Sequence, residues 1–270
     1  MNRGIRRNRK IKKTLLVGLA AGLGVGLIFS AVMVNREKGR SETIQSRLET
    51  ENSKMQSQNK KLKQKAKESV DVQVVSAETL QGQDANWEMV LVNDTHPLDT
   101  QYTPTLVDVA ENKAVDSRIV DDTNQMLDDA KNAGLSMIVC SAYRSYDDQK
   151  GVFNETMQTW INQGMSYVDA YDETKKSVAV PGTSEHATGL ALDITSSQYQ
   201  ELDDKQADTA EAKWLAENCY KYGFVLRYPV NKAEVTGIVY EPWHYRYVGK
   251  DNAKKITDEG LTLEEYLAQQ

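Results

Sequence analysis

Apolar and polar residues alternate between Leu190 and Ile194, and this period of two predicts a strand with one apolar face. Asp193 has the opposite parity, so its carboxylate is expected on the other face, where burial without a counter-charge would cost several kcal/mol. Gly189 comes directly before the strand and permits a sharp turn. That turn would let His186 fold back toward Asp193.

Apolar spacing elsewhere in the chain predicts further elements of both kinds. Helices are expected at 120–133, 147–164, 208–222 and 261–267. Strands are expected at 135–140 and 224–228, and a short strand or extended segment is expected at 87–92. Turns are expected at 96–98, 181–183 and 229–234. In the helix at 147–164 one face carries the apolar residues Val152, Phe153, Met157, Trp160 and Ile161. This mixture of helices and strands indicates an α+β domain.

The N-terminal part of the chain has a different pattern. Residues 1–13 contain seven Arg or Lys and no acid, and residues 14–34 form an uncharged run that can cross ~30 Å of hydrocarbon as a helix. The end of this run has no clean small-x-small cleavage site, so we predict an uncleaved signal anchor, with a cleaved signal peptide as the alternative. The positive-inside rule keeps the basic tail in the cytoplasm. We therefore expect a single-pass protein of the cell membrane with its C-terminal bulk outside, on the cell-wall side.

Residues 35–83 are predicted to form a polar stalk and connector that precede a globular domain at 84–270. The part at 35–69 is rich in Lys, Glu, Gln and Ser and lacks proline, which fits either a helix or a flexible spacer. Leu48, Met55 and Leu62 recur every seven residues, but too few times to establish a coiled coil. The pattern leaves the oligomeric state open. The domain at 84–270 is long enough to bury a core of its own.

Charge is distributed unevenly along the chain. The formal net charge is −6, yet the residues after position 13 carry 26 basic and 39 acidic side chains and so sum to −13. An acidic globular domain argues against nucleic acid as a partner.

Candidate chemistry is concentrated in two short stretches that contain two of the three histidines. Asp193 follows His186 by seven residues, and Glu241 precedes His244 by three. Two imidazoles and one carboxylate are enough protein ligands for a catalytic zinc, which keeps a fourth position for water, and a further Glu beside it can be the general base. Pro242 interrupts any strand here, and a bend at this residue could bring Glu241 and His244 into one pocket. Each residue alone would more often be structural, so the prediction depends on the combination.

These stretches resemble the motifs of a known enzyme family. Ser-x-His-x-x-x-x-x-x-Asp, from Ser184 to Asp193, and Glu-x-x-His, from Glu241 to His244, are similar to the motifs of zinc D-alanyl-D-alanine carboxypeptidases of the VanY type. The wider group includes D-Ala-D-Ala dipeptidases, L,D-carboxypeptidases and the Hedgehog signalling domain. A third stretch at 141–149 looks like the family's Tyr-Arg-Ser segment. The resemblance extends from about residue 87 to 270, with the motifs in family order.

The resemblance implies a role for each residue of the site. Zn²⁺ would be held by His186, Asp193 and His244, while Glu241 would take a proton from water and pass it to the leaving amine. Arg144 would donate hydrogen bonds to the oxyanion that develops on the attacked carbonyl. A serine at the position of the first motif would bind the terminal carboxylate of the substrate. The candidate substrate contacts are Ser184, Gln149 and Tyr143.

The resemblance also implies a fold and a reaction. A small, mostly antiparallel sheet would carry the zinc site, with helices packed against it, as in Hedgehog-like and D,D-peptidase domains. The expected reaction is hydrolysis of the C-terminal D-alanine from a peptidoglycan stem peptide. L,D-carboxypeptidases share the motifs and shorten tetrapeptide stems, so that activity is the alternative. A non-catalytic, zinc-stabilised module that binds the cell wall is a further alternative, although binding alone would not need a base such as Glu241.

The two cysteines leave two outcomes open. Cys140 falls in a predicted core strand, and Cys219 falls on the inward face of a predicted helix. In an oxidising exterior two such residues can form a disulfide, whereas two separate buried thiols are the other outcome. The sequence does not give the distance between them, which decides the matter.

Overall fold

The structure is a computed structural model that describes residues 46–47, 49–50, 53–54, 56–57, 60, 74–76, 80 and 86–270. The chain divides into two compact units, residues 1–64 and 65–270, and the described residues of the first unit are helical. The predicted basic tail and signal anchor lie outside the described residues. Within the described part of the chain, no helix is both long enough and apolar enough to span a membrane.

The second unit is built on a four-stranded antiparallel sheet with the strand order β3-β4-β6-β5. Its strands are β3 (Met137–Ser141), β4 (Ala191–Ser196), β6 (His244–Tyr247) and β5 (Phe224–Leu226). The strand expected after Gly189 is therefore confirmed as the centre of the sheet. The order also places β4 beside β6, so the two candidate stretches become neighbours in space. The α+β class and the antiparallel sheet agree with the sequence analysis.

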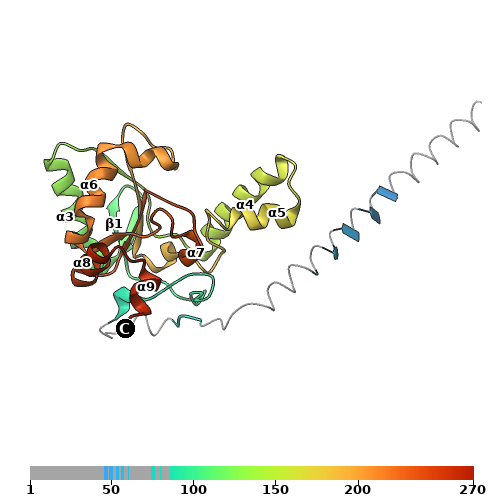
Figure 1. Cartoon of the computed structure of the whole chain (residues 1–270), viewed down its shortest axis with the longest axis horizontal. Coiled ribbons are helices and arrows are strands. Elements are labelled where there is room, and N and C mark those ends of the chain that lie inside the picture. Colours follow the sequence, from blue (N-terminus) through green and yellow to red (C-terminus); the bar gives the residue numbers. More distant parts are fainter. Residues whose placement is uncertain are drawn as a thin grey trace, which may run out of the picture. The chain divides into compact units, whose positions relative to one another are not determined.

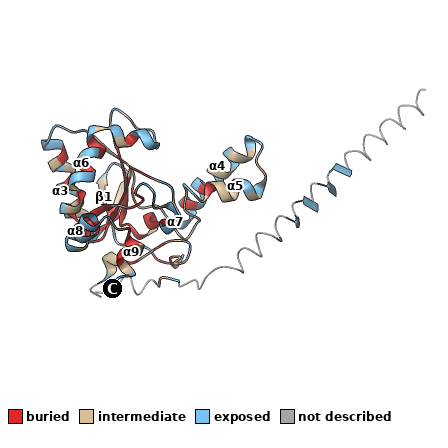
Figure 2. Cartoon of the chain, in the orientation of Figure 1, coloured by how far each residue is buried: buried red, intermediate tan, exposed pale blue. Residues whose placement is uncertain are grey.

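The main hydrophobic core lies on one face of this sheet, beneath α3 (Val120–Asn132) and α6 (Ala210–Asn218). Leu192 and Ile194 of β4 belong to this core, as does Tyr245 of β6. Figure 2 shows the buried residues concentrated around the sheet. Because side chains alternate along a strand, Asp193 and His244 project from the opposite face, as the alternation predicted for Asp193.

A second core closes the C-terminal end of the unit. It joins Val225 of β5 to Ile256 of α8 (Lys250–Glu259) and to Leu263 of α9 (Leu263–Leu267). The closing helix α9 was predicted, and a capping box between Thr262 and Glu265 fixes its start. Helix α8 was not predicted, because only a narrow strip of its surface is apolar.

Helices α4 (Tyr146–Asn162) and α5 (Tyr167–Thr174) pack against each other and project from the rest of the unit (Figure 1). The predicted apolar face of α4 is only partly covered. Phe153 is buried and contacts the ring of Tyr171, whereas Val152 is 36% exposed. Val152 instead lines a cavity, described below.

Three local features differ from the sequence expectations. Residues 87–92 do not form a strand: Trp87–Met89 is the 3-10 helix η1, and only the residues after it follow the extended alternative, where Val90 and Val92 are buried. The helix expected at 208–222 breaks into α6 and the 3-10 helix η5 (Cys219–Tyr222). A hairpin of β1 (Leu106–Ala110) and β2 (Lys113–Asp116) was missed because most of β1 is not buried.

Both cysteines are free, so the disulfide does not form. Cys219 is buried in the main core, and Cys140 on β3 donates from its Sγ to the carbonyl oxygen of Asp193 at 3.2 Å. The alternative of two separate thiols is the one that the structure adopts.

Candidate active site

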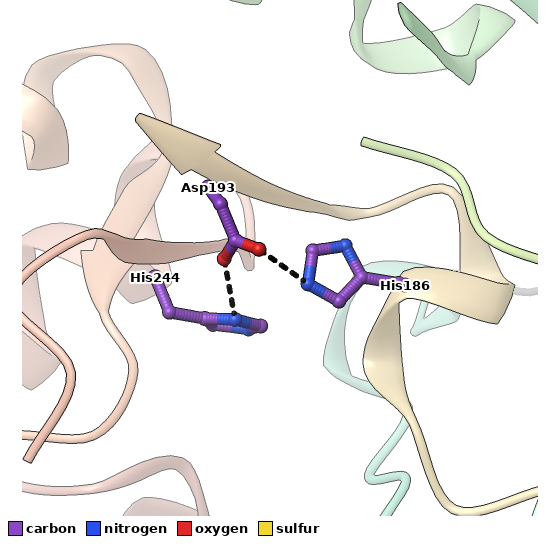
Figure 3. A group of neighbouring side chains, drawn as sticks. All are labelled: His186, Asp193 and His244. Carbon is purple, nitrogen blue, oxygen red and sulfur yellow. Dashed lines mark ion pairs between the residues drawn. The ribbon is translucent and has the colours of Figure 1, made fainter. Parts of the chain in front are cut away.

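Asp193 and His244 face each other as cross-strand partners of β4 and β6. Directly opposed residues of an antiparallel pair hold their side chains within about 5 Å, so the register alone brings a carboxylate to an imidazole. His244 Nδ1 lies 3.1 Å from Asp193 Oδ1 (Figure 3). Both side chains are buried.

His186 reaches the same point from the 3-10 helix η3 (Glu185–Thr188), which ends at Gly189. Gly189 has a φ of 74°, and a Cβ atom there would lie 2.8 Å from the backbone nitrogen of Asp116. The predicted sharp turn is thus confirmed, and it requires glycine. His186 Nδ1 lies 2.7 Å from the carbonyl oxygen of Ala142, which leaves Nε2 directed toward Asp193 Oδ2 at 3.2 Å.

His186, Asp193 and His244 therefore form one group, with a ligand atom from each residue within 4.8 Å of the others. The donor set of two imidazole nitrogens and one carboxylate oxygen is that of a catalytic zinc centre. Asp193 Oδ1 is buried and makes no hydrogen bond in this geometry, as expected for an atom that a cation would satisfy. His96, the third histidine, is not part of this group.

The two imidazoles differ in electrostatic surroundings. Burial lowers the pKa of His186, and the nearby Arg144 guanidinium acts in the same direction. Burial also opposes charge on His244, but Asp193 and Glu185 outweigh it and raise its pKa to about 9. Burial alone would raise the pKa of Asp193, yet the two imidazoles hold it well below its usual range. Asp193 is therefore a carboxylate at neutral pH.

Glu241 enters the site from the bend at Pro242. Its backbone N–H donates to the carbonyl oxygen of Tyr228, and its own carbonyl oxygen accepts from the N–H of His244. Glu241 Oε2 lies 3.7 Å from His244 Nδ1, so the bend places both side chains in one pocket as predicted. Burial is the main reason that the pKa of this carboxyl is raised to about 8. Such a group can gain and lose a proton near neutral pH.

Arg144 follows β3 and is held by two hydrogen bonds. One terminal nitrogen donates to Gln149 Oε1 at 2.8 Å, and the other donates to Ser141 Oγ at 2.7 Å. The latter nitrogen also lies 3.7 Å from Asp193 Oδ2, at the edge of the metal-ligand group. The guanidinium is thus aimed at the site from a strand-to-helix junction, the place that the sequence indicated.

The predicted substrate contacts lie around the same point. The candidate metal ligands line a cavity of about 320 Å³, together with Arg144, Ser184 and Glu241. The apolar wall of this cavity includes Val152, Tyr228, Ile238 and Trp243. Ser184 and Gln149 also border a neighbouring cavity of about 150 Å³, where Tyr143 lies. The amide of Gln149 is engaged on both sides, because its Nε2 donates to the carbonyl oxygen of Ala179. The roles of Ser184, Gln149 and Tyr143 toward substrate stay predictions.

Comparison with known proteins places this geometry in a family. The VanY family model, described as D-alanyl-D-alanine carboxypeptidase, matches residues 112–250. A D-alanyl-D-alanine carboxypeptidase from Enterococcus faecalis is 37% identical over 200 residues, which cover 74% of this chain and 73% of that protein. This chain belongs to the VanY family. The family resemblance drawn from the motifs is therefore confirmed, and with it the assignment as a zinc-dependent D-alanyl-D-alanine carboxypeptidase.

Two solved structures resemble this VanY-family chain closely. A mutant of the vancomycin-resistance D,D-pentapeptidase VanY from a VanB-type cassette, in complex with Zn(II), is 39% identical with a TM-score of 0.61; the match covers 67% of this chain and 99% of that one. The LdcB LD-carboxypeptidase is 38% identical, also with a TM-score of 0.61, and the match covers 74% of this chain and 92% of that one.

Three charged residues beside the candidate metal ligands of this VanY-family chain were not predicted from the sequence. Glu185, Arg227 and Arg246 are almost completely buried, and both arginines contact Glu185. A signal for Arg246 was present, because it follows His244 by two residues in β6 and so projects from the same face. Glu185 stands between two motif residues, but nothing in the sequence shows that its side chain meets arginines 42 and 61 residues away.

Proposed function

We propose that this chain removes the C-terminal D-alanine from peptidoglycan stem peptides, and that its zinc ligands are His186, Asp193 and His244. The observation that carries the proposal is the placement of this donor set, Glu241 and Arg144 around one cavity. Zinc bound here would polarise the scissile carbonyl and lower the pKa of water toward ~7.

Glu241 would act as the general base and then as the general acid. Its pKa of about 8 in the metal-free site makes both protonation states accessible near neutral pH, and a bound cation would favour the carboxylate. A proton taken from water by this carboxylate can be delivered to the leaving amine of D-alanine. The position beside His244 Nδ1, at 3.7 Å, supports this role because it is adjacent to the proposed ligands without being required as one.

Arg144 and Ser184 would hold the substrate. The Arg144 guanidinium is fixed by Gln149 and Ser141, so it can donate to a developing oxyanion without reorganising during the reaction. Gln149 would support that arginine in addition to its predicted contact with substrate. Ser184 is buried where the two cavities meet, a position suited to hydrogen-bonding a terminal carboxylate.

L,D-carboxypeptidase activity is the second candidate, because LdcB matches this chain with the same TM-score as the VanY D,D-pentapeptidase. The D,D reading is preferred because the matching family model and the Enterococcus faecalis relative both carry the D-alanyl-D-alanine carboxypeptidase description.

The proposed location is the cell membrane, with residues 14–34 as a single-pass anchor and the zinc domain outside. Support comes from the seven basic residues before an uncharged run of membrane-spanning length. Peptidoglycan is assembled outside the membrane, so this orientation would bring the domain to its substrate.

The test is mass spectrometry of defined pentapeptide and tetrapeptide stems incubated with the purified chain. We expect conversion of pentapeptide to tetrapeptide with release of D-alanine. The matched control is Glu241→Gln, which preserves shape but cannot accept a proton, and which should slow turnover ~10²–10⁴-fold while retaining zinc. Cleavage of the tetrapeptide alone would replace the D,D assignment by L,D. Near wild-type turnover of Glu241→Gln would remove the proposed base.

A further inference from the structure

The two ring nitrogens of His244 face different groups of charged side chains. Nδ1 faces Asp193 and Glu241, at 3.1 and 3.7 Å. Nε2 faces Glu185 Oε2 at 3.5 Å. Glu185 has no exposed side-chain surface, and it is not among the residues that group as metal ligands.

One oxygen of Glu185 is already saturated. Oε1 accepts from Arg227 Nε at 2.7 Å and from a terminal nitrogen of Arg246 at 3.0 Å. Arg227 is fixed in turn by a two-pronged contact with Glu264, at 2.6 and 2.9 Å. Arg246 is fixed by backbone carbonyl oxygens, including that of Val90 at 2.8 Å. The Glu185 side chain is therefore held in one orientation by groups that are themselves held.

The other oxygen of Glu185 has no hydrogen bond, and neither has His244 Nε2. Both atoms are buried, and a buried polar atom without a hydrogen-bond partner destabilises the fold. They face each other at 3.5 Å, so a shift of about 0.5 Å would bring them to an ordinary N–H···O distance of ~3.0 Å. Each atom is thus the partner that the other lacks.

We propose that Glu185 is a positioning residue for zinc binding: it accepts the Nε2–H of His244 and so presents the Nδ1 lone pair of that ring to the metal. This inference deepens the proposed function and depends on His244 being a zinc ligand. Neutral imidazole has one donor and one acceptor nitrogen, so fixing the proton on Nε2 makes Nδ1 the acceptor. His186 is fixed in the opposite sense, since its Nδ1 faces the carbonyl oxygen of Ala142.

The charge balance of the cluster explains why it can be buried. Two arginines, Arg227 and Arg246, are matched by two carboxylates, Glu185 and Glu264, so the four side chains sum to zero. Two guanidinium groups donate to Glu185, and such contacts favour the ionised carboxylate over the neutral acid. Glu185 can therefore face His244 as a carboxylate whose charge is largely neutralised by the arginines.

Glu185→Gln is the most direct test, because the amide replaces one of the two acceptor oxygens of the carboxylate with an NH₂ donor. That oxygen would stay with the two arginines, which only donate, and the amide NH₂ would then face His244 Nε2. A donor at that position favours the tautomer with the proton on Nδ1, where it blocks the metal. Loss of such an outer partner typically lowers metal affinity ~10–100-fold. We expect a zinc dissociation constant raised by that factor, measured by chelator competition on the full-length chain.

Glu264→Gln is the matched control. It removes the same charge from the same cluster, at the side of Arg227 that is remote from His244. A purely structural role for the cluster predicts equal losses of zinc affinity in the two variants. We expect thermal stability to fall in both, but zinc affinity to fall in Glu264→Gln by less than about twofold. Equal zinc affinities in the two variants would overturn the proposal.

A second measurement on the wild-type chain keeps the proposal testable if Glu185→Gln fails to fold. With ¹⁵N-labelled histidine, nitrogen–proton correlation spectra of the zinc-loaded chain should show two rings of opposite tautomer, one carrying its proton on Nε2 and one on Nδ1. Two metal-binding rings that both carry the proton on Nδ1 would overturn it. His244→Ala distinguishes failure of the proposed ligand set from failure of the proposed role of Glu185. Retention of zinc in His244→Ala would refute the ligand set. Loss of zinc in His244→Ala, with full zinc affinity in Glu185→Gln, would refute only the role of Glu185.

Discussion

At the residue scale, the two histidines of the site have pKa values shifted in opposite directions. His244 has a pKa raised to about 9, whereas the pKa of His186 is lowered. A metal ligand must be deprotonated, so binding of zinc near neutral pH has to displace a proton from the region of His244. Zinc affinity is therefore expected to rise with pH over the neutral range.

Glu241 gives a pH dependence of stability that can be measured on the zinc-free chain. Burial raises its pKa from 4.5 to about 8, so between these values the folded state holds a proton that the unfolded state has lost. Unfolding free energy therefore falls as pH rises from about 5 to 8, by up to ~1.4 kcal/mol per pH unit. His244, raised from 6.5 to about 9, adds loss in the same direction above pH 6.5. Chelated wild-type chain should be measured by denaturant unfolding at several pH values.

Glu241→Gln is the control for this pH dependence, because its amide does not titrate. Its unfolding free energy should fall less steeply than that of the wild type between pH 5 and 8. Asp193 does not contribute in this window, since its pKa is lowered and its stabilisation is lost only as pH falls below about 4. Parallel curves for the two proteins would show that Glu241 is not protonated in the folded, zinc-free state.

At the same scale, the sequence indicated the candidate metal ligands and base but not the buried charged residues beside them. His186, Asp193, Glu241 and His244 could be recognised because their spacing is local and their chemistry is specific. Glu185 could not be recognised, because its meaning depends on arginines from two other strands or strand ends that only the tertiary structure brings together.

At the scale of elements, two features position the metal ligands: the β4–β6 register and the turn at Gly189. The register was beyond sequence reasoning, because the pairing of strands some fifty residues apart depends on the whole fold. The turn was predictable, because Gly189 stands directly before the alternating strand pattern and only three residues after His186. Helix α8 was missed because few of its residues are apolar.

Gly189→Ala should damage both stability and the zinc site. A left-handed φ of 74° costs an L-residue ~1–2 kcal/mol, and the new Cβ would meet the Asp116 nitrogen at 2.8 Å and Pro104 Cγ at 3.2 Å. Overpacking of this kind adds ~1–3 kcal/mol. Because Gly189 sets the entry of β4 and the position of η3, His186 should be displaced as well. Denaturant unfolding and zinc affinity are the two measurements.

Gly134→Ala is matched to this change in backbone conformation but not in crowding. Gly134 has a φ of 85°, and a Cβ there would have no atom within 4 Å. It should lose only the ~1–2 kcal/mol of the left-handed conformation and should bind zinc as the wild type does. If both variants lost the same stability and both kept full zinc affinity, the close approach of Gly189 to Asp116 would have no structural importance.

At the scale of the whole molecule, the chain joins a zinc domain to an N-terminal part of different composition. The α+β fold was predictable, since the alternation around β4 and the apolar faces of α3 and α6 are strong local signals. The separation of α4 and α5 from the core was not, because a helix with a partly apolar face can cover either a core or a cavity wall. Val152 shows this, as it lies on the apolar stripe of α4 but borders the cavity.

The proposed topology follows from the charge of the first 13 residues, and it can be tested with protease on intact protoplasts of an expressing bacterium. The uncharged run at 14–34 can span the bilayer in either direction, so the seven basic residues decide the orientation. Protease added outside should therefore digest the zinc domain and leave a short N-terminal fragment. The matched variant replaces those basic side chains with glutamine: Arg3, Arg6, Arg7, Arg9, Lys10, Lys12 and Lys13. It keeps the apolar run but loses the retention signal, so part of the population should become protected from protease. Protection of the wild-type zinc domain, with a cytoplasmic marker protein intact, would place the domain inside and separate it from assembled peptidoglycan.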